Sequence, residues 1–200
     1  EIKFIKLDLR DSTKLKNLFK KYKFKKVIHL AAQPGVRYSL INPAAYFENN
    51  LVAFFNLIEL SRLFKIEHFI YASSSSVYGN IKKYPLKEKF IVNSPISSYA
   101  TTKKCNELMA ESYHLNFNLN CTGLRFFTVY GPFGRPDMSA YNFVRRIMKN
   151  KYISVFNKGH HARDFTYIDD AVDAVYKILK KNKKKIITKF TILVMEIQNP

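Results

Sequence analysis

The apolar residues of the chain fall into short runs separated by longer stretches with helical spacing. Short runs predict strands over 2–7, 27–32, 68–72, 120–127 and 153–156. Val27-Ile28-His29-Leu30-Ala31-Ala32 is continuously apolar, which is typical of a strand buried on both faces of a parallel sheet. His29 is therefore interpreted as a core residue rather than a catalyst.

Between these runs, the spacing of apolar residues predicts helices over 11–22, 43–64, 98–117, 140–150 and 169–181. Asp11 or Ser12 can cap the first helix, and Pro43 suits the first turn of the second. Polar or Pro/Gly-rich loops are expected over 33–42, 79–97 and 131–136. Strands that alternate with helices of ten or more residues predict an α/β fold with a doubly wound parallel sheet.

Length and composition exclude several classes of protein. With 200 residues and 47% hydrophobic residues, the chain can bury a core, which excludes wholesale disorder. No apolar run approaches the ~18 residues of a membrane span, and no cleavable signal is visible, so no membrane partner is expected. Cys105 and Cys121 lack metal-ligand spacing, which predicts no metal site and fits a reducing cytoplasm.

The formal net charge is +19, and 26 of the 34 basic residues are Lys. A nucleic-acid surface often interleaves Arg and aromatic residues on one face, and this pattern is not seen. We therefore expect a solvated Lys-rich surface and no specific nucleic-acid partner. A non-catalytic polyanion-binding protein is kept as an alternative that charge alone supports.

Candidate chemistry begins with Tyr99-Ala100-Thr101-Thr102-Lys103. If this segment opens a helix, Tyr99 and Lys103 lie at i and i+4 on one face. An ammonium beside a phenol favours the phenolate and lowers the phenol pKa from about 10. Such a pair can act as a general base at neutral pH. Because Tyr-x-x-x-Lys is a common spacing, the pair on its own is more simply interpreted as an ordinary exposed helix pair.

Polar residues also gather where the predicted strands end. Ser73–Ser76 follow one buried strand directly, Asp8 ends the first strand, and Gln33 ends the second. Residues 125–131 end the fourth strand. Because ligands bind at the carboxyl ends of parallel strands, these groups are expected to face one crevice.

The sequence resembles the extended short-chain dehydrogenase/reductase family of NAD-dependent epimerases and dehydratases, which have a Rossmann-like fold. The matching segments, in the order the family has them, are LDLRD, VIHLAAQPGVRYS, NPAAYFENN, YASSSSVYG, SSYATTKK, GLRFFTVYGPFGRPDM and RDFTYIDDAVDAV. They cover about Phe4 to Val175. Within the family, HLAAQPGVRYS, TVYGPFGRPDM and KKCNELMA are most similar to UDP-glucuronate 4-epimerases.

The resemblance implies a role for each matching residue. Tyr99 would be the catalytic base and acid, Lys103 would assist it and bind the nicotinamide ribose, and Ser74 would bind the reacting sugar hydroxyl. The residues implied in NAD binding are Asp8, Leu9, Leu30, Ala31, Ala32, Gln33, Asn49, Tyr99, Lys103 and Phe127. Those implied in binding the UDP-sugar are Arg37, Ser75, Ser76, Thr128, Arg135 and Arg163.

The implied reaction inverts C4 of UDP-glucuronate through a 4-keto sugar, giving UDP-galacturonate, with NAD recycled in each turnover. A nucleotide-sugar 4,6-dehydratase is the alternative enzyme. That chemistry needs a Thr-Asp-Glu sequence at the strand end, where this chain has Ser74-Ser75-Ser76. The resemblance also implies a homodimer of the full-length protein, formed through the helices over 43–64 and 98–117.

The chain departs from the family pattern at both ends. None of its six glycines forms the G-x-x-G-x-x-G turn that holds the pyrophosphate of NAD, and the first two strands are missing. We therefore expect 1–130 to be an incomplete NAD-binding domain, 131–187 a partial substrate-binding region, and the isolated fragment to be inactive. If the chain from Lys189 onward is written in A/T-rich codons and the reading frame is moved back by one base, the codons give Lys-Ile-Tyr-Asn-Ile-Gly. Family members carry this segment at that place. Residues 188–200 are thus hypothesised to be a frameshifted tail, with a natural hydrophobic strand as the alternative.

Overall fold

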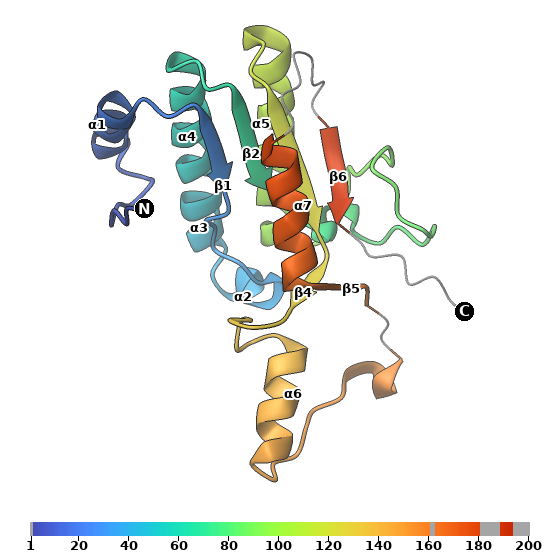
Figure 1. Ribbon diagram of the computed structural model, residues 1–200. Helices are drawn as coiled ribbons and strands as arrows, with labels where there is room; N and C mark the ends of the chain where they lie inside the picture. The colour runs from blue at the N-terminus through green and yellow to red at the C-terminus, as the bar shows by residue number, and fades with distance from the viewer. Residues whose placement is uncertain (1, 161–162, 181–188, 194–200) are drawn as a thin grey trace. The chain divides into compact units, whose positions relative to one another are not determined.

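The computed structural model describes residues 2–160, 163–180 and 189–193 (Figure 1). It divides into two compact units. Unit 1 runs to Arg125 and includes Lys189–Ile192, and unit 2 begins at Phe126 and runs to Lys180. Among the described residues, none of the helices combines the length and the hydropathy that a membrane crossing requires.

Unit 1 is built on a four-stranded sheet in the order β1-β2-β3-β6. Strands β1, β2 and β3 run parallel, with Lys26 opposite His68 and Phe69 opposite Cys121. This arrangement confirms the predicted α/β fold with a parallel sheet. The strands are β1 (Lys26–His29), β2 (His68–Ala72), β3 (Cys121–Phe126) and β6 (Lys189–Leu193).

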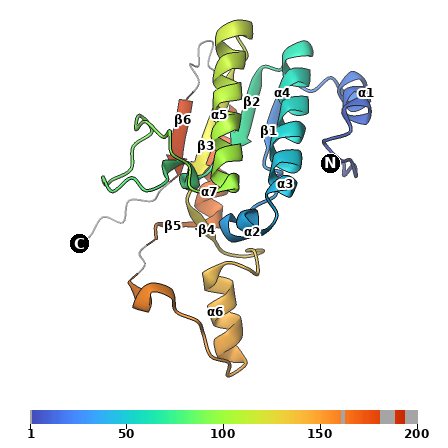
Figure 2. The ribbon, with the colours of Figure 1, turned by 180° about the vertical axis from the view of Figure 1, so that it is seen from behind.

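Several helices of unit 1 begin after a residue whose side chain caps them. Asp11 accepts a hydrogen bond from the Lys14 amide at 3.0 Å, and Ser97 accepts one from the Ala100 amide at 3.1 Å. Figure 2 shows α4 and α5 side by side on the same face of the sheet. The helical elements are α1 (Ser12–Tyr22), α2 (Val36–Ile41), α3 (Pro43–Tyr46), the π-helical turn η1 (Phe47–Val52), α4 (Ala53–Leu63), the 3₁₀ turn η2 (Ser75–Tyr78) and α5 (Ser98–Phe117).

The core of unit 1 lies between these helices and the sheet. Its buried residues come from α1, α4, α5, β2 and β3, and from the segments just before β2 and β3. Their removal from water is the main favourable term in folding this unit. They are Leu15, Phe19, Phe54, Leu57, Ile58, Leu60, Ile66, Phe69, Tyr71, Ala110, Leu119 and Cys121.

Unit 2 contains a short parallel pair, β4 (Thr128–Tyr130) and β5 (Phe165–Tyr167). Helix α7 (Ile168–Lys180) contacts both strands. Its first turn carries Asp169 and Asp170, whose negative charges interact favourably with the positive end of the helix dipole. The unit also contains α6 (Ser139–Met148) and the 3₁₀ turn η3 (Phe156–Gly159).

Two predicted strands are wrong. Residues 2–7 are irregular, and Ile2 and Phe4 are 99% and 86% exposed. Residues 153–155 are also irregular and lead into η3. Alternating or apolar runs form a strand only where a neighbour completes the hydrogen-bond ladder, and no described strand pairs with either segment.

Other boundaries differ from the prediction by less. Strand β1 ends at His29 and is buried on one face only, since His29 is buried whereas Ile28, which points to the other face, is 38% exposed. The expected loop 33–42 contains α2, and the helix over 43–63 includes a π-helical turn. His29 is buried, as predicted. Cys121 is also buried, and Cys105 is partly buried.

Residues Lys189–Leu193 form β6 beside β3, as the interpretation of the tail as a natural strand predicts. Thr188 and residues 194–200 lie outside the described residues. The frameshift hypothesis stays a prediction, and sequencing the codons of this segment tests it.

Candidate active site

The serine run lies directly at the carboxyl end of β2. The Ser73 amide donates to the Leu124 carbonyl at 2.8 Å, which continues the pairing of β2 with β3 by one residue. The chain then turns into η2, and Ser74 Oγ caps this turn by accepting from the Ser76 amide at 3.1 Å. Ser73 and Ser74 are buried, whereas Ser75 and Ser76 are half-buried.

Tyr99 and Lys103 lie in the first two turns of α5, as the i, i+4 spacing predicts. Lys103 is buried, and its Nζ donates to the carbonyl of Ala72, the last residue of β2, at 2.8 Å. The same Nζ lies 6.0 Å from the centre of the Tyr99 ring. Burial lowers the pKa of Lys103 to about 8. The structure thus brings Lys103 and Tyr99 to the end of β2, where the serine run begins.

Asn50 is a buried residue of this region that the sequence interpretation missed. Its Oδ1 accepts from the Gln33 amide at 2.7 Å, and its Nδ2 donates to the Gln33 carbonyl and to Thr102 Oγ1, both at 3.1 Å. One side chain therefore joins the loop after β1 to α5. Asn49, which is predicted to line the cofactor path, donates to the Ala45 carbonyl one helical turn before it at 2.7 Å.

The spacing of buried residues distinguishes the two asparagines. Tyr46, Asn50 and Phe54 are each fully buried and follow one another at intervals of four, so they share one helix face. Because Asn50, unlike Asn49, lies four residues from both Tyr46 and Phe54, this spacing in the sequence could have identified it as the buried asparagine.

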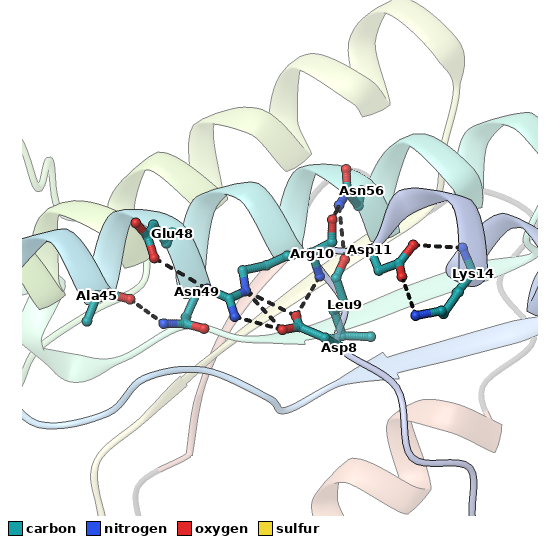
Figure 3. Close-up of polar contacts among 9 residues, drawn as sticks. All are labelled: Asp8, Leu9, Arg10, Asp11, Lys14, Ala45, Glu48, Asn49 and Asn56. Atoms are coloured by element: carbon teal, nitrogen blue, oxygen red, sulfur yellow. Dashed lines mark hydrogen bonds and ion pairs between the residues drawn. The ribbon is translucent and has the colours of Figure 1, made fainter.

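Asp8 and Leu9 lie in a turn that is fixed to the helix over 47–63 (Figure 3). Arg10 binds the Asp8 carboxylate, with Nη2 and Oδ2 2.7 Å apart, and this hydrogen bonding lowers the pKa of Asp8 to about 2. Asn56 Nδ2 donates to the Leu9 carbonyl at 2.9 Å, and Arg10 also reaches Glu48 at 3.3 Å. The Asp8 side chain remains 53% exposed, so its carboxylate is accessible.

The other residues predicted in unit 1 follow β1 or lie on α2. Leu30 and Ala31 are exposed, and Ala32 and Gln33 are half-buried, so this loop presents a partly open surface. Arg37 lies on α2 and is exposed.

Unit 2 holds the remaining predicted residues, Phe127, Thr128, Arg135 and Arg163. The Thr128 amide donates to the Asp164 carbonyl at 3.2 Å, which brings Thr128 beside the segment that carries Arg163. Thr128 and Arg135 both line a cavity of about 650 Å³ between the β4 segment and α6. The Arg135 guanidinium binds Asp137, with Nε and Oδ1 3.0 Å apart. Phe127 is half-buried.

Metal ligation has no candidate in the part of the chain that the structure describes. No group of three or more His, Cys, Asp or Glu side chains is placed there to hold an ion. Among the polar groups at the β2 end, the Ser73–Ser76 and Tyr99 side chains supply hydroxyls and Lys103 supplies an ammonium, which suits proton transfer and hydrogen bonding to sugar hydroxyls.

A protein-family model described as "NAD dependent epimerase/dehydratase family" matches residues 1–190. The chain belongs to this family. The match covers Tyr99, Lys103, the serine run and both units, so the family's fold accounts for nearly all of the described residues.

Relatives in this family include UDP-glucuronate 4-epimerase 3 of Arabidopsis thaliana, 50% identical over 169 residues, or 82% of this chain and 39% of that protein. Protein CapI of Staphylococcus aureus is 48% identical over 89% of this chain and 53% of its own length. The chain spans about half the length of the curated relatives it matches.

Solved structures of family members have the same fold. The UDP-glucuronic acid 4-epimerase from Bacillus cereus, solved with UDP-glucuronic acid and NAD, superposes with a TM-score of 0.89 at 36% identity. The alignment covers 96% of this chain and 60% of that one. The UDP-glucose 4-epimerase of Thermus thermophilus, in complex with NAD, has a TM-score of 0.85 at 26% identity, over 96% of this chain and 63% of that one.

Proposed function

We propose that this chain carries the catalytic residues of an NAD-dependent epimerase that interconverts UDP-glucuronate and UDP-galacturonate by inverting C4. The observation that carries the proposal is the position of Lys103. Its ammonium is buried between the end of β2 and the Tyr99 ring, next to the serine run. Relatives about 50% identical to the chain are named UDP-glucuronate 4-epimerases.

In the proposed reaction, Tyr99 takes the proton of the sugar 4-hydroxyl and later returns it. The Lys103 ammonium, 6.0 Å from the ring centre, favours the phenolate that this step needs. Ser74 orients the same hydroxyl by hydrogen bonding. NAD held at this site would supply the hydride acceptor and donor that inversion at C4 requires.

The described residues fit the nicotinamide end of such a cofactor. An ammonium has three donors, and the Ala72 carbonyl accounts for one donor of Lys103, so the buried amine can also bind ribose hydroxyls. The exposed Asp8 carboxylate can accept hydrogen bonds from the adenine end. Gln33, which Asn50 holds by both main-chain groups, would border the path between these ends.

The serine run favours epimerisation over the alternative dehydratase activity. A dehydratase needs a carboxylic acid at the strand end, and residues 73–76 carry only hydroxyls. We assign the uronic acid as the sugar because of the relatives' names and because Arg37 and Arg135 supply cations suited to a carboxylate. Arg163 is proposed to bind the diphosphate.

We further propose that the full-length protein is a homodimer that buries the outer faces of α4 and α5. These adjacent helices expose Phe55, Leu63, Leu108 and Leu115 at 48%, 51%, 52% and 74%. Two such helix pairs can form a four-helix interface. Sedimentation analysis should show a dimer that Phe55→Glu with Leu115→Glu converts to a monomer, and a monomeric parent protein would refute the proposal.

The activity is tested on the 200-residue chain and on a chimera. In the chimera, residues 1–190 replace the matching part of the Bacillus cereus enzyme, which supplies the segments outside this chain. We expect the chimera to interconvert the two UDP-uronates with NAD, and Tyr99→Phe to lower kcat by about 10³-fold or more because the acid/base group is lost. A folded chimera without activity would refute the function. Retention of the chain on heparin only at low salt would then favour polyanion binding.

A further inference from the structure

A buried ion pair lies behind the serine run. Arg125, the last residue of unit 1 on β3, is 1% exposed, and Glu107 on α5 is fully buried. The guanidinium binds the carboxylate through two parallel hydrogen bonds, Nε to Oε1 at 2.8 Å and Nη2 to Oε2 at 2.9 Å. This bidentate geometry fixes both the distance and the orientation of the two side chains.

The same ion pair holds both ends of the segment that carries the serines. At one end, Ser73 Oγ donates to Glu107 Oε1 at 2.6 Å. At the other end, Arg125 Nη1 donates to Tyr78 Oη at 3.0 Å. Residues 74–77 therefore span two anchors that are themselves joined by the ion pair. The Tyr78 hydroxyl also donates to the Lys87 carbonyl at 3.2 Å, which ties the following loop to the same group.

Glu107 continues a series on the buried side of α5. Tyr99, Lys103 and Glu107 follow one another at intervals of four, so they lie along one face of the helix. Lys103 holds Ala72, and Glu107 holds the next residue, Ser73. One helix face thus carries the proposed base and also fixes the start of the serine run.

Stability alone does not explain a charged pair at this position. Removing two charges from water is costly, and apolar residues of similar volume often stabilise a fold equally well. What an ion pair adds is directional bonding, which apolar side chains lack. Both Ser73 and Tyr78 use that directionality here.

We propose that Glu107 and Arg125 are positioning residues that set Ser74, Ser75 and Ser76 at a fixed place relative to Tyr99 and Lys103. Glu107 and Arg125 hold the two ends of this segment through the contacts to Ser73 and Tyr78. Its catalytic consequence rests on the proposed epimerase function. Loosening either anchor should let the 74–77 segment move while the rest of the fold stays intact.

The first test measures amide hydrogen exchange in the 200-residue chain, so it does not depend on activity. The reporters are the amides of Ser76, Val77 and Gly79, which donate to Ser74 Oγ, the Ser74 carbonyl and the Ser76 carbonyl. Ser73→Ala and Tyr78→Phe should each speed their exchange about tenfold, since each removes one hydrogen bond to a charged group. Exchange of the Leu15 and Phe69 amides, on α1 and β2, should not change.

Matched variants control for the loss of a buried hydroxyl elsewhere. Ser61 is fully buried and its Oγ donates to the Leu57 carbonyl at 2.7 Å, so Ser61→Ala matches Ser73→Ala. Tyr113 Oη donates to Glu59 at 3.0 Å, so Tyr113→Phe matches Tyr78→Phe. Neither control should alter exchange in residues 76–79. Ser73→Thr, which keeps the hydroxyl, should restore slow exchange.

The second test measures kinetics in the chimera. Ser73→Ala and Tyr78→Phe should lower kcat about tenfold with little change in KM, because misplaced hydroxyls affect the transition state more than binding. Glu107→Gln should lower kcat further if this variant folds. If it does not fold, the kcat values of Ser73→Ala and Tyr78→Phe test the positioning role.

The outcomes separate this inference from the proposed function. Faster exchange confined to residues 76–79 supports the positioning role even if the parent chimera lacks activity, which would refute only the epimerase proposal. Unchanged exchange in both anchor variants, or an equal rise throughout the chain, would overturn the positioning role. An active chimera in which Ser73→Ala and Ser61→Ala have the same kcat would also overturn it.

Discussion

At the scale of single residues, the candidate site is built from polar groups that are costly to bury. Lys103 is 3% exposed, and burial lowers its pKa from 10.5 to about 8. The folded chain therefore holds a proton at this amine less tightly than the unfolded chain does. Below pH 8 the amine is charged in both states, so the folded state carries the full penalty of burying that charge.

Replacing this charge should stabilise the protein. We expect Lys103→Met to raise the free energy of unfolding at pH 7 by about 1–3 kcal/mol, less than the full pKa shift implies because the Ala72 carbonyl loses its donor. Urea unfolding measures the change. Lys16→Met, at an exposed position on α1, should leave stability within about 0.5 kcal/mol. A destabilised Lys103→Met variant would contradict the argument.

Asn50, unlike Lys103, should stabilise the folded protein. Asn50→Ala leaves both main-chain groups of Gln33 without their partner, so we expect a loss of about 1–3 kcal/mol. Asn49→Ala removes a bond within one helix turn and should cost much less. Thermal unfolding of the two variants compares the neighbours directly, and equal losses would contradict the assignment.

At the scale of elements, the pairing of β2 with β3 depends on one glycine. Tyr71 and Gly123 are opposite one another in the register, and a Cβ on Gly123 would lie 2.7 Å from Tyr71 Oη and 2.8 Å from its Cζ. The Tyr71 ring is fully buried and belongs to the core. The space that glycine leaves on β3 is thus filled by an aromatic ring from β2.

Two substitutions across this contact should have opposite effects. Gly123→Ala should destabilise the protein by about 1–3 kcal/mol because the buried ring cannot move without disturbing the core. Tyr71→Phe should be neutral or stabilising, since the Tyr71 hydroxyl is buried without a hydrogen-bond partner among the described residues. Chemical denaturation of both variants provides the check, and a tolerated Gly123→Ala would show that β2 and β3 can separate at this point.

At the scale of the whole molecule, two buried histidines make stability depend on pH. Burial, with a smaller contribution from the Lys103 charge, lowers the pKa of His29 to about 4. Burial, with a smaller contribution from Lys26, lowers the pKa of His68 to about 4. Both imidazoles are neutral in the folded chain at pH 6, whereas unfolded histidines titrate near pH 6.5.

The unfolded chain therefore binds more protons between pH 6.5 and pH 4. The stability that these neutral histidines contribute is fully present above pH 6.5 and is lost as pH falls to 4, by up to about 3 kcal/mol for each. Melting temperatures at pH 7, 5.5 and 4.5 should fall in that order, and His29→Leu with His68→Gln should flatten the profile. Asp8 does not interfere, because the Arg10 hydrogen bonds lower its pKa to about 2. A flat profile for the parent chain would refute this prediction.

Much of the fold follows from local sequence. The cap at Asp11, the proline at the start of α3, and the apolar run of β2 all lie where the sequence predicts them. The segments 2–7 and 153–156 show the limit of such reasoning. Their patterns suit a strand, but a strand also needs a neighbour, and a local pattern does not supply one.

By itself, the sequence determined the α/β class, the family, the long helices and buried strands of unit 1, and the spacing that puts Tyr99 and Lys103 on one helix face. These depend on residues near one another in the chain. Only the tertiary structure decided that Asn50 rather than Asn49 meets Gln33, that Lys103 reaches Ala72, and that Glu107 joins Ser73 to Arg125. These partners are 17 to 34 residues apart. A buried polar group must find a partner wherever the fold brings one, so packing rather than spacing along the chain selects it.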